Sequence, residues 1–363
     1  MRFKRTMLLL VALFACLLPR TGEAGPALLV DASNGKVLYA EDQDDLWHPA
    51  SLTKIMTAYI AFDALRKKRI TLDQKIGVSE KAHLQSPSKV GLPVGAEMSV
   101  DLALKALIVK SANDVAIMLA EAIGGSEDGF VKLMNDTARR LGMSRTTFVN
   151  ANGLPAEAQV TTARDLARLS LAVIRDFPER RPLWTMQEVQ VGKLRLPSHN
   201  KLLKSYDGAD GLKTGFICDS GYNIVASATR EGRRLIAVVL GEPSGRDRNL
   251  RAASLLEHGF QTYGWKLLFN TVTLDTLPRP ADAKGIVSVR DSVIGWNCGK
   301  RNAQRPIARG KAKSRVKRRA TAKKAHPKGQ PAPKTAKAPA RKPAEGTSAS
   351  ASAKTKHSAK ATP

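Results

Sequence analysis

Cysteine is scarce in this chain, with only three among 363 residues: Cys16, Cys218 and Cys298. So few cysteines exclude a small scaffold held together by many disulfides. Their scattered spacing also excludes a zinc site built from cysteine ligands, and we expect no metal or other cofactor. Export would place Cys218 and Cys298 in an oxidising compartment, where their pairing depends on a Cα separation that a sequence does not give.

Acidic residues are also scarce, above all at the C-terminal end. The chain carries 59 Lys and Arg against 32 Asp and Glu, a formal charge of +27. Residues 299–363 hold 20 of the basic residues and one acid, Glu345, whereas residues 25–298 hold 35 basic and 30 acidic residues. The excess charge belongs to a terminal segment, which excludes a uniformly basic nucleic-acid-binding domain.

This terminal segment, residues 299–363, lacks aromatic residues and has almost no large aliphatic ones. It cannot bury enough apolar surface to offset its chain entropy, so we predict a disordered basic tail rich in Ala, Lys and Pro. Without aromatic side chains it has no stacking platform for single-stranded nucleic acid, and we expect no nucleic-acid partner. The expected partner is an anionic membrane or cell-wall surface, and the alternative is a solubilising extension without a partner.

The N-terminal apolar run, residues 7–18, is shorter than the about 20 residues that a membrane-spanning helix needs. It follows basic residues and precedes small residues that end at Ala24, which is the pattern of an export signal. We therefore predict that residues 1–24 are a signal peptide and that the protein is exported to the periplasm or cell envelope, peripheral to the membrane. The alternatives are an uncleaved anchor and lipid attachment at Cys16, which the preceding Phe14 fits poorly.

Residues 25–265 show the patterns of a folded domain. Two apolar runs, residues 27–30 and 36–40, flank the turn Asn34-Gly35 and predict a hairpin. Helical spacing of apolar residues and later short apolar runs predict helices over residues 52–64, 100–109, 116–123, 130–141, 163–174 and 250–263, and strands over residues 224–228 and 235–240. This order predicts an α/β fold in which both ends of the chain complete one antiparallel sheet around an inserted helical block.

The predicted organisation has four parts. They are the signal peptide 1–24, the folded domain 25–265, a short appendage 266–298 in which the core signal thins, and the basic tail 299–363. No repeat of about 20–50 residues is present, which excludes a solenoid.

Ser51-Leu52-Thr53-Lys54 places a hydroxyl and an amine three positions apart at the start of a helix, where they share one face. A serine hydroxyl becomes a nucleophile when a neighbour takes its proton, and a lysine does so when burial or another cation lowers its pKa. Free N–H groups at the helix start favour negative charge that develops beside Ser51. The same pattern recurs at Ser86-Pro87-Ser88-Lys89, but the Gly- and Pro-rich residues after it do not continue a helix.

Two further motifs carry polar groups suited to the same chemistry. Ser111-Ala112-Asn113 lies between two predicted helices, where the serine hydroxyl can pass protons and the asparagine amide can bind a substrate amide. The alternative is that Ser111, Asn113 or Asp114 only caps the next helix. Lys213-Thr214-Gly215 offers a cation and a hydroxyl to a carboxylate, and its glycine lets a substrate backbone lie against the strand. The alternative there is an edge strand guarded by a lysine. All three motifs together arise by chance far less often than any one of them.

These motifs resemble those of the penicillin-binding serine D-alanyl-D-alanine carboxypeptidases of low molecular mass, over about residues 27–263. Other stretches that carry the resemblance are Asn150-Ala151-Asn152-Gly153-Leu154, Asn200-Lys201-Leu202-Leu203 and Gly208-Ala209-Asp210-Gly211-Leu212. The resemblance implies that residues 25–265 are a penicillin-binding catalytic domain. Its implied fold is α/β and β-lactamase/transpeptidase-like, with a five-stranded antiparallel sheet flanked by helices and an inserted helical subdomain.

The resemblance also implies an activity, which is removal of the terminal D-alanine of peptidoglycan stem peptides through an acyl-enzyme, with β-lactam antibiotics as covalent inhibitors. The implied catalytic residues are Ser51 as nucleophile, Lys54 as its base and Ser111 as proton relay. The implied substrate-binding residues are Asn113 for the backbone amide, Lys213 and Thr214 for the terminal carboxylate, and Gly215 and Phe216 along the strand. Backbone N–H groups of Ser51 and Phe216 would form the oxyanion hole.

Two departures from the family pattern stand out. Phe216 occupies a position where many relatives carry a histidine, so its side chain cannot bind substrate by hydrogen bonding. Many relatives carry a β-rich second domain and an amphipathic anchoring helix after the catalytic domain. We expect too little sequence for them after Tyr263, where a basic tail follows instead.

Three other functions use some of the same features. A serine β-lactamase with a Glu-activated water needs a Glu-x-x-Leu-Asn stretch between the second and third motifs, and none is present. A D,D-endopeptidase that cuts peptidoglycan cross-links would use the same residues and stays open. A non-catalytic envelope-binding protein would have no need of Lys54 and Lys213 together.

Overall fold

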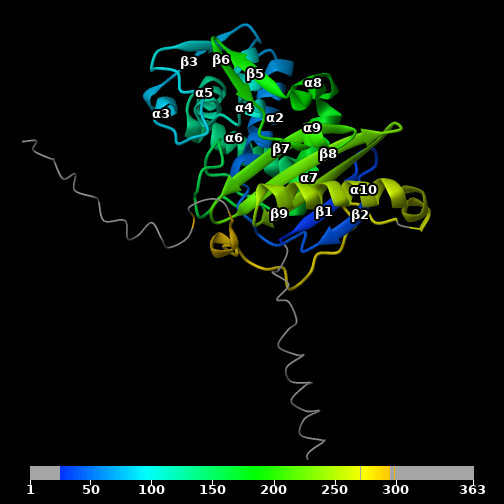
Figure 1. Cartoon of the computed structure of the whole chain (residues 1–363). Coiled ribbons are helices and arrows are strands. Elements are labelled where there is room, and N and C mark those ends of the chain that lie inside the picture. The colour runs from blue at the N-terminus through cyan, green and yellow to red at the C-terminus, as the bar shows by residue number, and fades with distance from the viewer. Residues whose placement is uncertain (1–24, 270, 295–297, 299–363) are drawn as a thin grey trace, which may run out of the picture. The chain divides into compact units, whose positions relative to one another are not determined.

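The computed structural model describes residues 25–269, 271–294 and 298, so the predicted signal peptide and basic tail lie outside the described residues. The described chain forms an α/β fold around a five-stranded antiparallel sheet with the order β2-β1-β9-β8-β7 (Figure 1). Its strands are β1 (Ala27–Asp31), β2 (Val37–Glu41), β7 (Ala209–Ile217), β8 (Gly221–Arg230) and β9 (Arg233–Glu242). The predicted sheet, completed by both ends of the domain, is confirmed.

Strand β1 shows why the two ends of the domain meet. It pairs with β2 on one side and with β9 on the other, so the first strand lies beside the last one. Leu28 and Val30 point into the larger core below the helical block, whereas Leu29 points into the core beneath α10. Both faces of β1 are buried, which accounts for its continuous apolar run. Strand β7 is left at the edge of the sheet.

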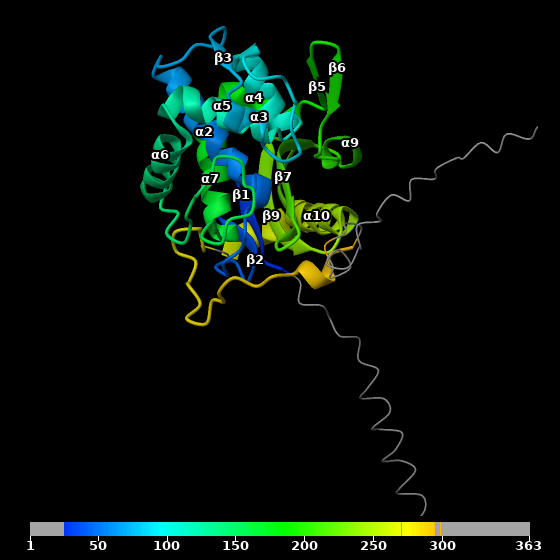
Figure 2. The same cartoon turned by 90° about the vertical axis from the view of Figure 1, so that its left-hand side faces the viewer.

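Helices cover both faces of the sheet (Figures 1 and 2). Helix α10 (Gly245–Phe269) packs on β8 and β9, and α7 (Ala163–Asp176) packs on β1 and β9 from the other side. The remaining helical elements are η1 (Ala50–Leu52), α2 (Thr53–Arg66), α3 (Glu80–His83), α4 (Val100–Val109), α5 (Asn113–Gly124), α6 (Glu127–Arg140), η2 (Pro178–Arg180), α8 (Arg181–Thr185), α9 (Leu202–Ser205) and η3 (Arg290–Ser292). In the part of the chain that the structure describes, no helix is long and apolar enough to cross a membrane.

Two small hairpins complete the helical block. Strand β3 (Lys75–Gly77) pairs with β4 (Glu97–Ser99), and β5 (Glu188–Val191) pairs with β6 (Leu194–Pro197). The second hairpin lies beside α4 and stands out from the helical block in Figure 2. Neither hairpin was predicted, because three- and four-residue strands leave too short a pattern.

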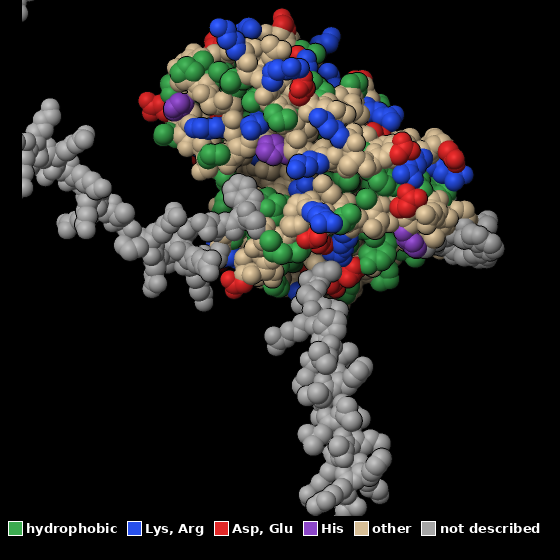
Figure 3. Space-filling view, viewed as in Figure 1, with side chains coloured by type: hydrophobic (Ala, Val, Ile, Leu, Met, Phe, Trp, Pro, Cys, Tyr) green, Lys and Arg blue, Asp and Glu red, His purple; other side chains and the backbone are tan. Residues whose placement is uncertain are grey.

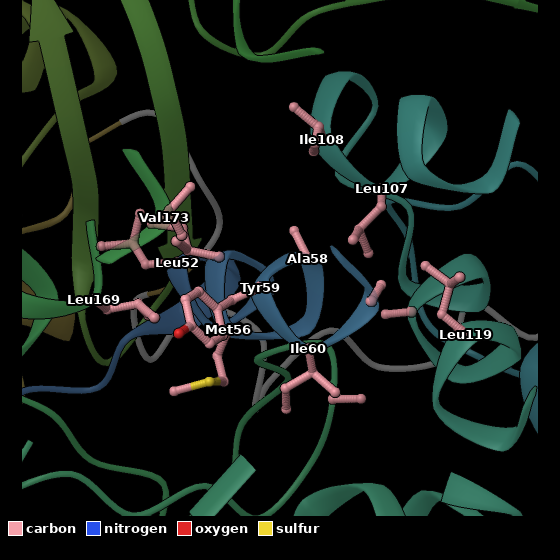
Figure 4. Packing of buried hydrophobic residues seen from close by; sticks show 14 of the residues in the cluster. Leu52, Met56, Ala58, Tyr59, Ile60, Leu107, Ile108, Leu119, Leu169 and Val173 are labelled. Carbon is pink, nitrogen blue, oxygen red and sulfur yellow. The ribbon is translucent and has the colours of Figure 1, made fainter. Parts of the chain in front are cut away.

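Helix α2 is the centre of the larger core. Every residue from Thr53 to Ala64 is buried, because α4, α5, α6 and α7 surround the helix. Figure 4 shows Met56, Tyr59 and Ile60 of α2 with side chains of the neighbouring helices around them. A helix that is apolar on all sides must lie inside the protein. The serine and lysine at its start are therefore held by a rigid element.

Residues 271–294 return along the domain after α10 (Figures 1 and 2). Arg164 of α7 is buried, and its Nε and Nη2 donate to the two carboxylate oxygens of Asp44, each at 2.7 Å. The same guanidinium donates to backbone carbonyls of this segment, those of Leu274, Leu277 and Pro278. A buried guanidinium needs such partners, so Arg164 fixes the returning segment to the domain.

The far end of the returning segment is attached beside β7. Cys218 and Cys298 form a disulfide with a Cα separation of 5.4 Å, which answers the question that the sequence left open. Arg290 also donates from Nε and Nη2 to the Asp219 carboxylate, at 3.0 and 2.9 Å. The turn between β7 and β8 is thus held by a covalent bond and an ion pair.

Candidate active site

Ser51 lies in η1, immediately before α2, and Lys54 lies in the first turn of that helix. The Lys54 side chain is 1% exposed, and its Nζ donates to Ser51 Oγ at 3.1 Å. The decoy pattern behaves differently, since Lys89 Nζ donates to the carbonyl of His83 at 2.7 Å. The prediction that the first Ser-x-x-Lys, and not the second, places its two groups on one helical face agrees with these contacts.

Lys54 makes two further contacts that decide the direction of its lone pair. Nζ donates to Asn113 Oδ1 at 2.6 Å and to the backbone carbonyl of Asn152 at 2.5 Å. Both acceptors are carbonyl oxygens, which cannot donate in return. A neutral amine has two N–H groups, and these two oxygens use both of them. In this neutral form the lone pair is left for the Ser51 hydroxyl, which then donates to Nζ as catalysis by a general base requires, whereas the protonated form donates to all three oxygens.

Electrostatics favour this neutral form. Burial, and after it the charge of Lys213, hold the pKa of Lys54 well below its usual value, although Asp114 acts in the opposite direction. Desolvation disfavours the charged form of an amine, and a nearby cation disfavours it further. The arrangement supplies what the sequence could only suggest, a lysine whose pKa is lowered in favour of the neutral amine that can accept a proton.

The second motif lies at the junction between α4 and α5. Ser111 has a left-handed φ of 60°, a conformation that residues with a Cβ atom adopt rarely, and it lines the pocket that also contains Ser51. The N-cap of α5 is Ala112, and no side chain caps that helix end. The capping alternative for Ser111 and Asn113 therefore has no support in the contacts.

Asn113 and Asp114 hold the loop that passes in front of the site. Asn113 Nδ2 donates to the carbonyl of Ser86 at 2.8 Å, while its Oδ1 accepts from Lys54. The two carboxylate oxygens of Asp114 accept from the backbone N–H groups of Val90 and Gly91, at 3.1 and 2.8 Å. A substrate amide would have to take over one of the contacts that Asn113 already makes.

The third motif lies on the edge strand β7. The Lys213 side chain is 2% exposed, and its Nζ donates to the carbonyl of Thr214 at 3.0 Å. Burial, and after it the charge of Arg248, lower the pKa of Lys213 to about 7. Gly215 lies so close to η1 that an added Cβ atom would be 2.9 Å from the Pro49 carbonyl oxygen and 3.1 Å from the Ser51 nitrogen. Glycine is thus required there for contact between β7 and the nucleophile, besides any contact with substrate.

A pocket of about 900 Å³ joins the three motifs. Six of the eight predicted site residues line it: Ser51, Ser111, Asn113, Thr214, Gly215 and Phe216. The buried side chains of Lys54 and Lys213 lie behind this wall and contact it. Lys and Arg side chains are also frequent on the molecular face between the helical block and α10 (Figure 3). The sequence thus identified residues that the fold brings together from four separate elements.

Three residues of the site were not assigned a role from the sequence. Arg248, in the first turn of α10, is buried in the pocket wall, and burial lowers its pKa to about 10. His199 lines the pocket. Desolvation by neighbouring protein atoms, and after it the charges of Lys213 and Lys110, lower the pKa of its imidazole to about 4. Asn152 contributes its backbone carbonyl to Lys54. Any residue type has a backbone carbonyl, so the sequence does not show this contact, although Asn152 lies in the Asn150-Ala151-Asn152 stretch quoted for the resemblance.

Phe216 follows the motif and lines the pocket with an aromatic ring. Its ring lies 4.4 Å from that of Tyr222 on β8, its partner across the strand pair. The guanidinium of Arg248 lies 6.0 Å from the Tyr222 ring centre. This end of the pocket is therefore apolar on one side and cationic on the other.

Comparisons with known proteins agree with the geometry of the site. The family model described as Peptidase S11, D-alanyl-D-alanine carboxypeptidase, matches residues 17–244. The chain is 40% identical over 253 residues to D-alanyl-D-alanine carboxypeptidase DacC of Escherichia coli K12, covering 68% of this chain and 62% of that protein. It is 36% identical over 245 residues to DacF of Bacillus subtilis, covering 66% and 63% respectively. The matched part thus spans less than two thirds of these curated relatives.

Solved structures give the same result for the fold. Penicillin-binding protein 6B of Escherichia coli superposes with a TM-score of 0.63 at 35% identity, covering 68% of this chain and 80% of that one. Penicillin-binding protein D2 of Listeria monocytogenes in its ampicillin-bound form gives a TM-score of 0.61 at 35% identity, covering 65% and 97%. The predicted penicillin-binding fold is confirmed, and the chain belongs to the Peptidase S11 family of D-alanyl-D-alanine carboxypeptidases.

Proposed function

We propose that this protein is a serine D-Ala-D-Ala carboxypeptidase that removes the terminal D-alanine of peptidoglycan stem peptides through an acyl-enzyme. The observation that supports this most is the contact of Ser51 Oγ with the buried amine of Lys54, whose two other contacts are carbonyl oxygens. A hydroxyl beside a neutral amine is an activated nucleophile. Membership of the family is consistent with this chemistry.

Acylation begins with transfer of a proton from Ser51 Oγ to Lys54 Nζ. Oγ forms a bond to the carbonyl carbon between the last two D-alanines, and the carbonyl oxygen takes the negative charge. Backbone N–H groups of Ser51 and Phe216 would bind that oxygen, and removal of one such donor costs about 3 kcal/mol of transition-state stabilisation. The close approach of β7 to η1 at Gly215 brings the strand and the nucleophile together for this purpose.

Collapse of the tetrahedral intermediate breaks the C–N bond. The proton held by Lys54 passes through the Ser111 hydroxyl to the departing amine, and D-alanine leaves. Water then attacks the ester, its hydroxyl joins the carbonyl carbon, and its proton returns to Ser51 Oγ through Lys54. Ser111 suits the relay because its side chain carries a hydroxyl and the residue lines the same pocket as Ser51.

Recognition of the terminal carboxylate falls to Lys213, Thr214 and Arg248. Burial, and after it the charge of Arg248, lower the pKa of Lys213, so a charged Lys213 is costly while the site is empty. An anionic group between the two residues offsets that cost, so the site favours a free carboxylate. The ring of Phe216 adds apolar contact and no hydrogen bond, in keeping with its packing on Tyr222.

Two parts of the proposal rest on the sequence. The absence of a Glu-x-x-Leu-Asn stretch suggests that penicillin is released slowly, because no Glu-activated water is provided. The signal-like residues 1–24 suggest export to the periplasm or cell envelope, and the basic tail suggests attachment to an anionic surface there. β-Lactam antibiotics are the proposed covalent inhibitors.

Release of D-alanine from a pentapeptide that ends in D-Ala-D-Ala tests the activity. The Ser51→Ala variant should release none, because the nucleophile is lost, while its thermal stability is retained. Ser86→Ala is the matched control, since Ser86 belongs to the decoy motif and its side chain has no place in the chemistry. Release that survives in the Ser51→Ala variant would contradict the proposed function.

A further inference from the structure

Two neighbouring residues of one loop hold both asparagines that accept from Lys54. Asn113 Nδ2 donates to the backbone carbonyl of Ser86 at 2.8 Å. Asn152 Nδ2 donates to the side-chain oxygen Oε1 of Gln85, also at 2.8 Å. The oxygens that these asparagines offer to Lys54 Nζ are Asn113 Oδ1 and the backbone carbonyl of Asn152. Gln85 and Ser86 are therefore linked to the base through its two carbonyl partners.

The side-chain amide of Gln85 joins the end of α3 to Asn152. Its Nε2 donates to the backbone carbonyl of Lys81 at 3.0 Å, and its Oε1 accepts from Asn152. Because both ends of the amide have a partner, Oε1 is held toward Asn152. Asn152 is 2% exposed, and Gln85 Oε1 is the acceptor of its Nδ2 in the described part of the chain. Without that oxygen a buried donor loses its partner, which favours movement of the turn that carries the Asn152 carbonyl.

This contact lies apart from the groups that a substrate would use. A substrate amide has to take over one of the contacts of Asn113, which are with Ser86 and Lys54. Gln85 and Asn152, by contrast, are not among the described residues that line the pocket. A bound peptide therefore leaves the pair of Gln85 and Asn152 in place. The Asn152 carbonyl is the acceptor of Lys54 that a substrate does not displace.

We propose that Gln85 is a positioning residue for the general base, since it holds the Asn152 carbonyl at Lys54 Nζ. This inference rests on the proposed acyl-enzyme function. In the neutral amine, an N–H group that donates to Asn152 leaves the lone pair for the Ser51 hydroxyl. When that acceptor moves away, the N–H group can turn toward Ser51 Oγ. The amine is then a donor to the nucleophile and does not act as its base.

The charged groups around Lys54 belong to other elements. Burial, and after it the charge of Lys213 on β7, lower the pKa of Lys54, whereas Asp114 on α5 raises it. His199, which precedes α9, is also affected by the charge of Lys54, and its own pKa of about 4 leaves it neutral near neutral pH. Gln85 carries no charge, so its replacement by another neutral residue leaves all of these charges in place.

The Asn152 carbonyl also affects the pKa of Lys54, because a carbonyl oxygen stabilises the protonated amine that donates to it. Loss of a well-held carbonyl should lower this pKa further. The low-pH limb of the acylation profile, where Lys54 becomes protonated, should then move to lower pH while the maximal rate falls. A substitution that only loosened the fold would lower the rate and the Tm together and leave the limb in place.

The test measures the rate at which a penicillin acylates the full-length purified protein over a range of pH. Gln85→Met has a similar length and no acceptor, and it should lower the maximal rate about tenfold and move the low-pH limb to lower pH. Gln85→Glu keeps an oxygen for Asn152 and cannot donate to Lys81, and it should stay within about threefold of the wild-type rate. Gln74→Met is the matched control and should be unchanged, because it loses only a contact of Gln74 Oε1 with the Thr71 N–H group outside the pocket.

A double-mutant cycle tests whether Gln85 acts through Asn152. Asn152→Ala removes the Nδ2 donor and retains the backbone carbonyl. It also loses the contact of Oδ1 with the Leu154 N–H group, but this loss cancels because both members of the pair share it. Adding Gln85→Met to Asn152→Ala should change the maximal rate by less than about twofold. A further loss of about tenfold would show that Gln85 acts by another route and would overturn the proposal.

The remaining outcomes separate the two proposals. The Gln85 proposal is wrong if Gln85→Met is acylated as fast as the wild-type protein, or slowly with an unmoved limb and a lowered Tm. It is also wrong if Gln85→Glu is as slow as Gln85→Met. In each of these cases the carboxypeptidase proposal stands. If the wild-type protein is not acylated at Ser51, the proposed function itself fails.

Discussion

The disulfide between Cys218 and Cys298 should contribute strongly to the stability of the domain. The two residues are 80 positions apart in the chain, so the disulfide closes a long loop in the unfolded protein. The chain-entropy relation for a loop of this length gives a stabilisation of about 4.5 kcal/mol at 25 °C. With an unfolding entropy of about 2.1 cal/mol/K per residue over roughly 270 folded residues, this corresponds to a fall in Tm of about 8 °C on reduction.

Differential scanning calorimetry of the purified protein with its disulfide formed, with and without a thiol reductant, measures this difference. The double variant Cys218→Ser with Cys298→Ser is the control, since its Tm should equal that of the reduced protein and not respond to reductant. Acylation by a fluorescent penicillin at 25 °C should persist, because Arg290 and Val289 still hold Asp219 at the end of β7. Oxidised and reduced proteins that melt within about 2 °C of each other would refute the reasoning.

Four further predictions concern the buried lysines and the tail. Lys54→Ala should slow acylation by penicillin by about 10²–10⁴-fold at unchanged Tm, as stopped-flow fluorescence can measure, because the base is lost. For a peptide that ends in a free carboxylate, kcat/KM should fall as pH rises through about 7, where Lys213 loses its charge. This fall should be absent in the Lys213→Ala variant and with a peptide that ends in an amide. Equal turnover of the acid and the amide would contradict the carboxylate-binding role of Lys213. Stability should change in the opposite direction, rising with pH between about 7 and 10.5, because the unfolded chain binds the Lys213 proton more tightly than the folded one. A chain that ends at Cys298 should keep its activity on soluble peptides and lose salt-sensitive co-sedimentation with anionic vesicles or isolated wall sacculi; equal sedimentation at low salt would show that the tail is no tether.

Much of the fold could be predicted from local patterns. The helix expected over residues 100–109 is α4, Val100–Val109, because its apolar residues recur with the helical period. Helix α5 begins at Asn113, before the apolar pattern that predicted its start at residue 116, since its first turn presents polar groups to Lys54 and to a loop. A search for apolar periodicity misses a helical turn whose side chains are polar and form hydrogen bonds with other parts of the protein.

The returning segment shows what a sequence pattern misses. Residues 266–298 contain little apolar periodicity, and yet Leu274 is buried and three carbonyls of the segment bind Arg164. A contact between backbone oxygens and a distant guanidinium depends on tertiary position, which local composition does not encode. The assignment of these residues as a separate appendage remains a prediction about domain organisation.

In the site too, some features follow from local sequence patterns and others depend on tertiary position. Motif spacing predicted the nucleophile, its base and the carboxylate-binding strand of the proposed function, because those roles require particular side chains in particular elements. The roles of Arg248 and of the Asn152 carbonyl depend on which elements the sheet and the helical block bring together, and no spacing along the chain predicts that. Arg248 is 35 positions after Lys213 and reaches the pocket because α10 packs across β8.

One measurement tests the central claim most directly, the activation of Ser51 by Lys54. The purified protein is incubated with a penicillin at neutral pH, digested, and analysed by mass spectrometry for the peptide that carries the penicilloyl group. The account predicts a single adduct on Ser51, absent from the Ser51→Ala variant and strongly reduced in Lys54→Ala. An adduct on any other residue, or undiminished labelling of Ser51 when Lys54 is replaced, would contradict it.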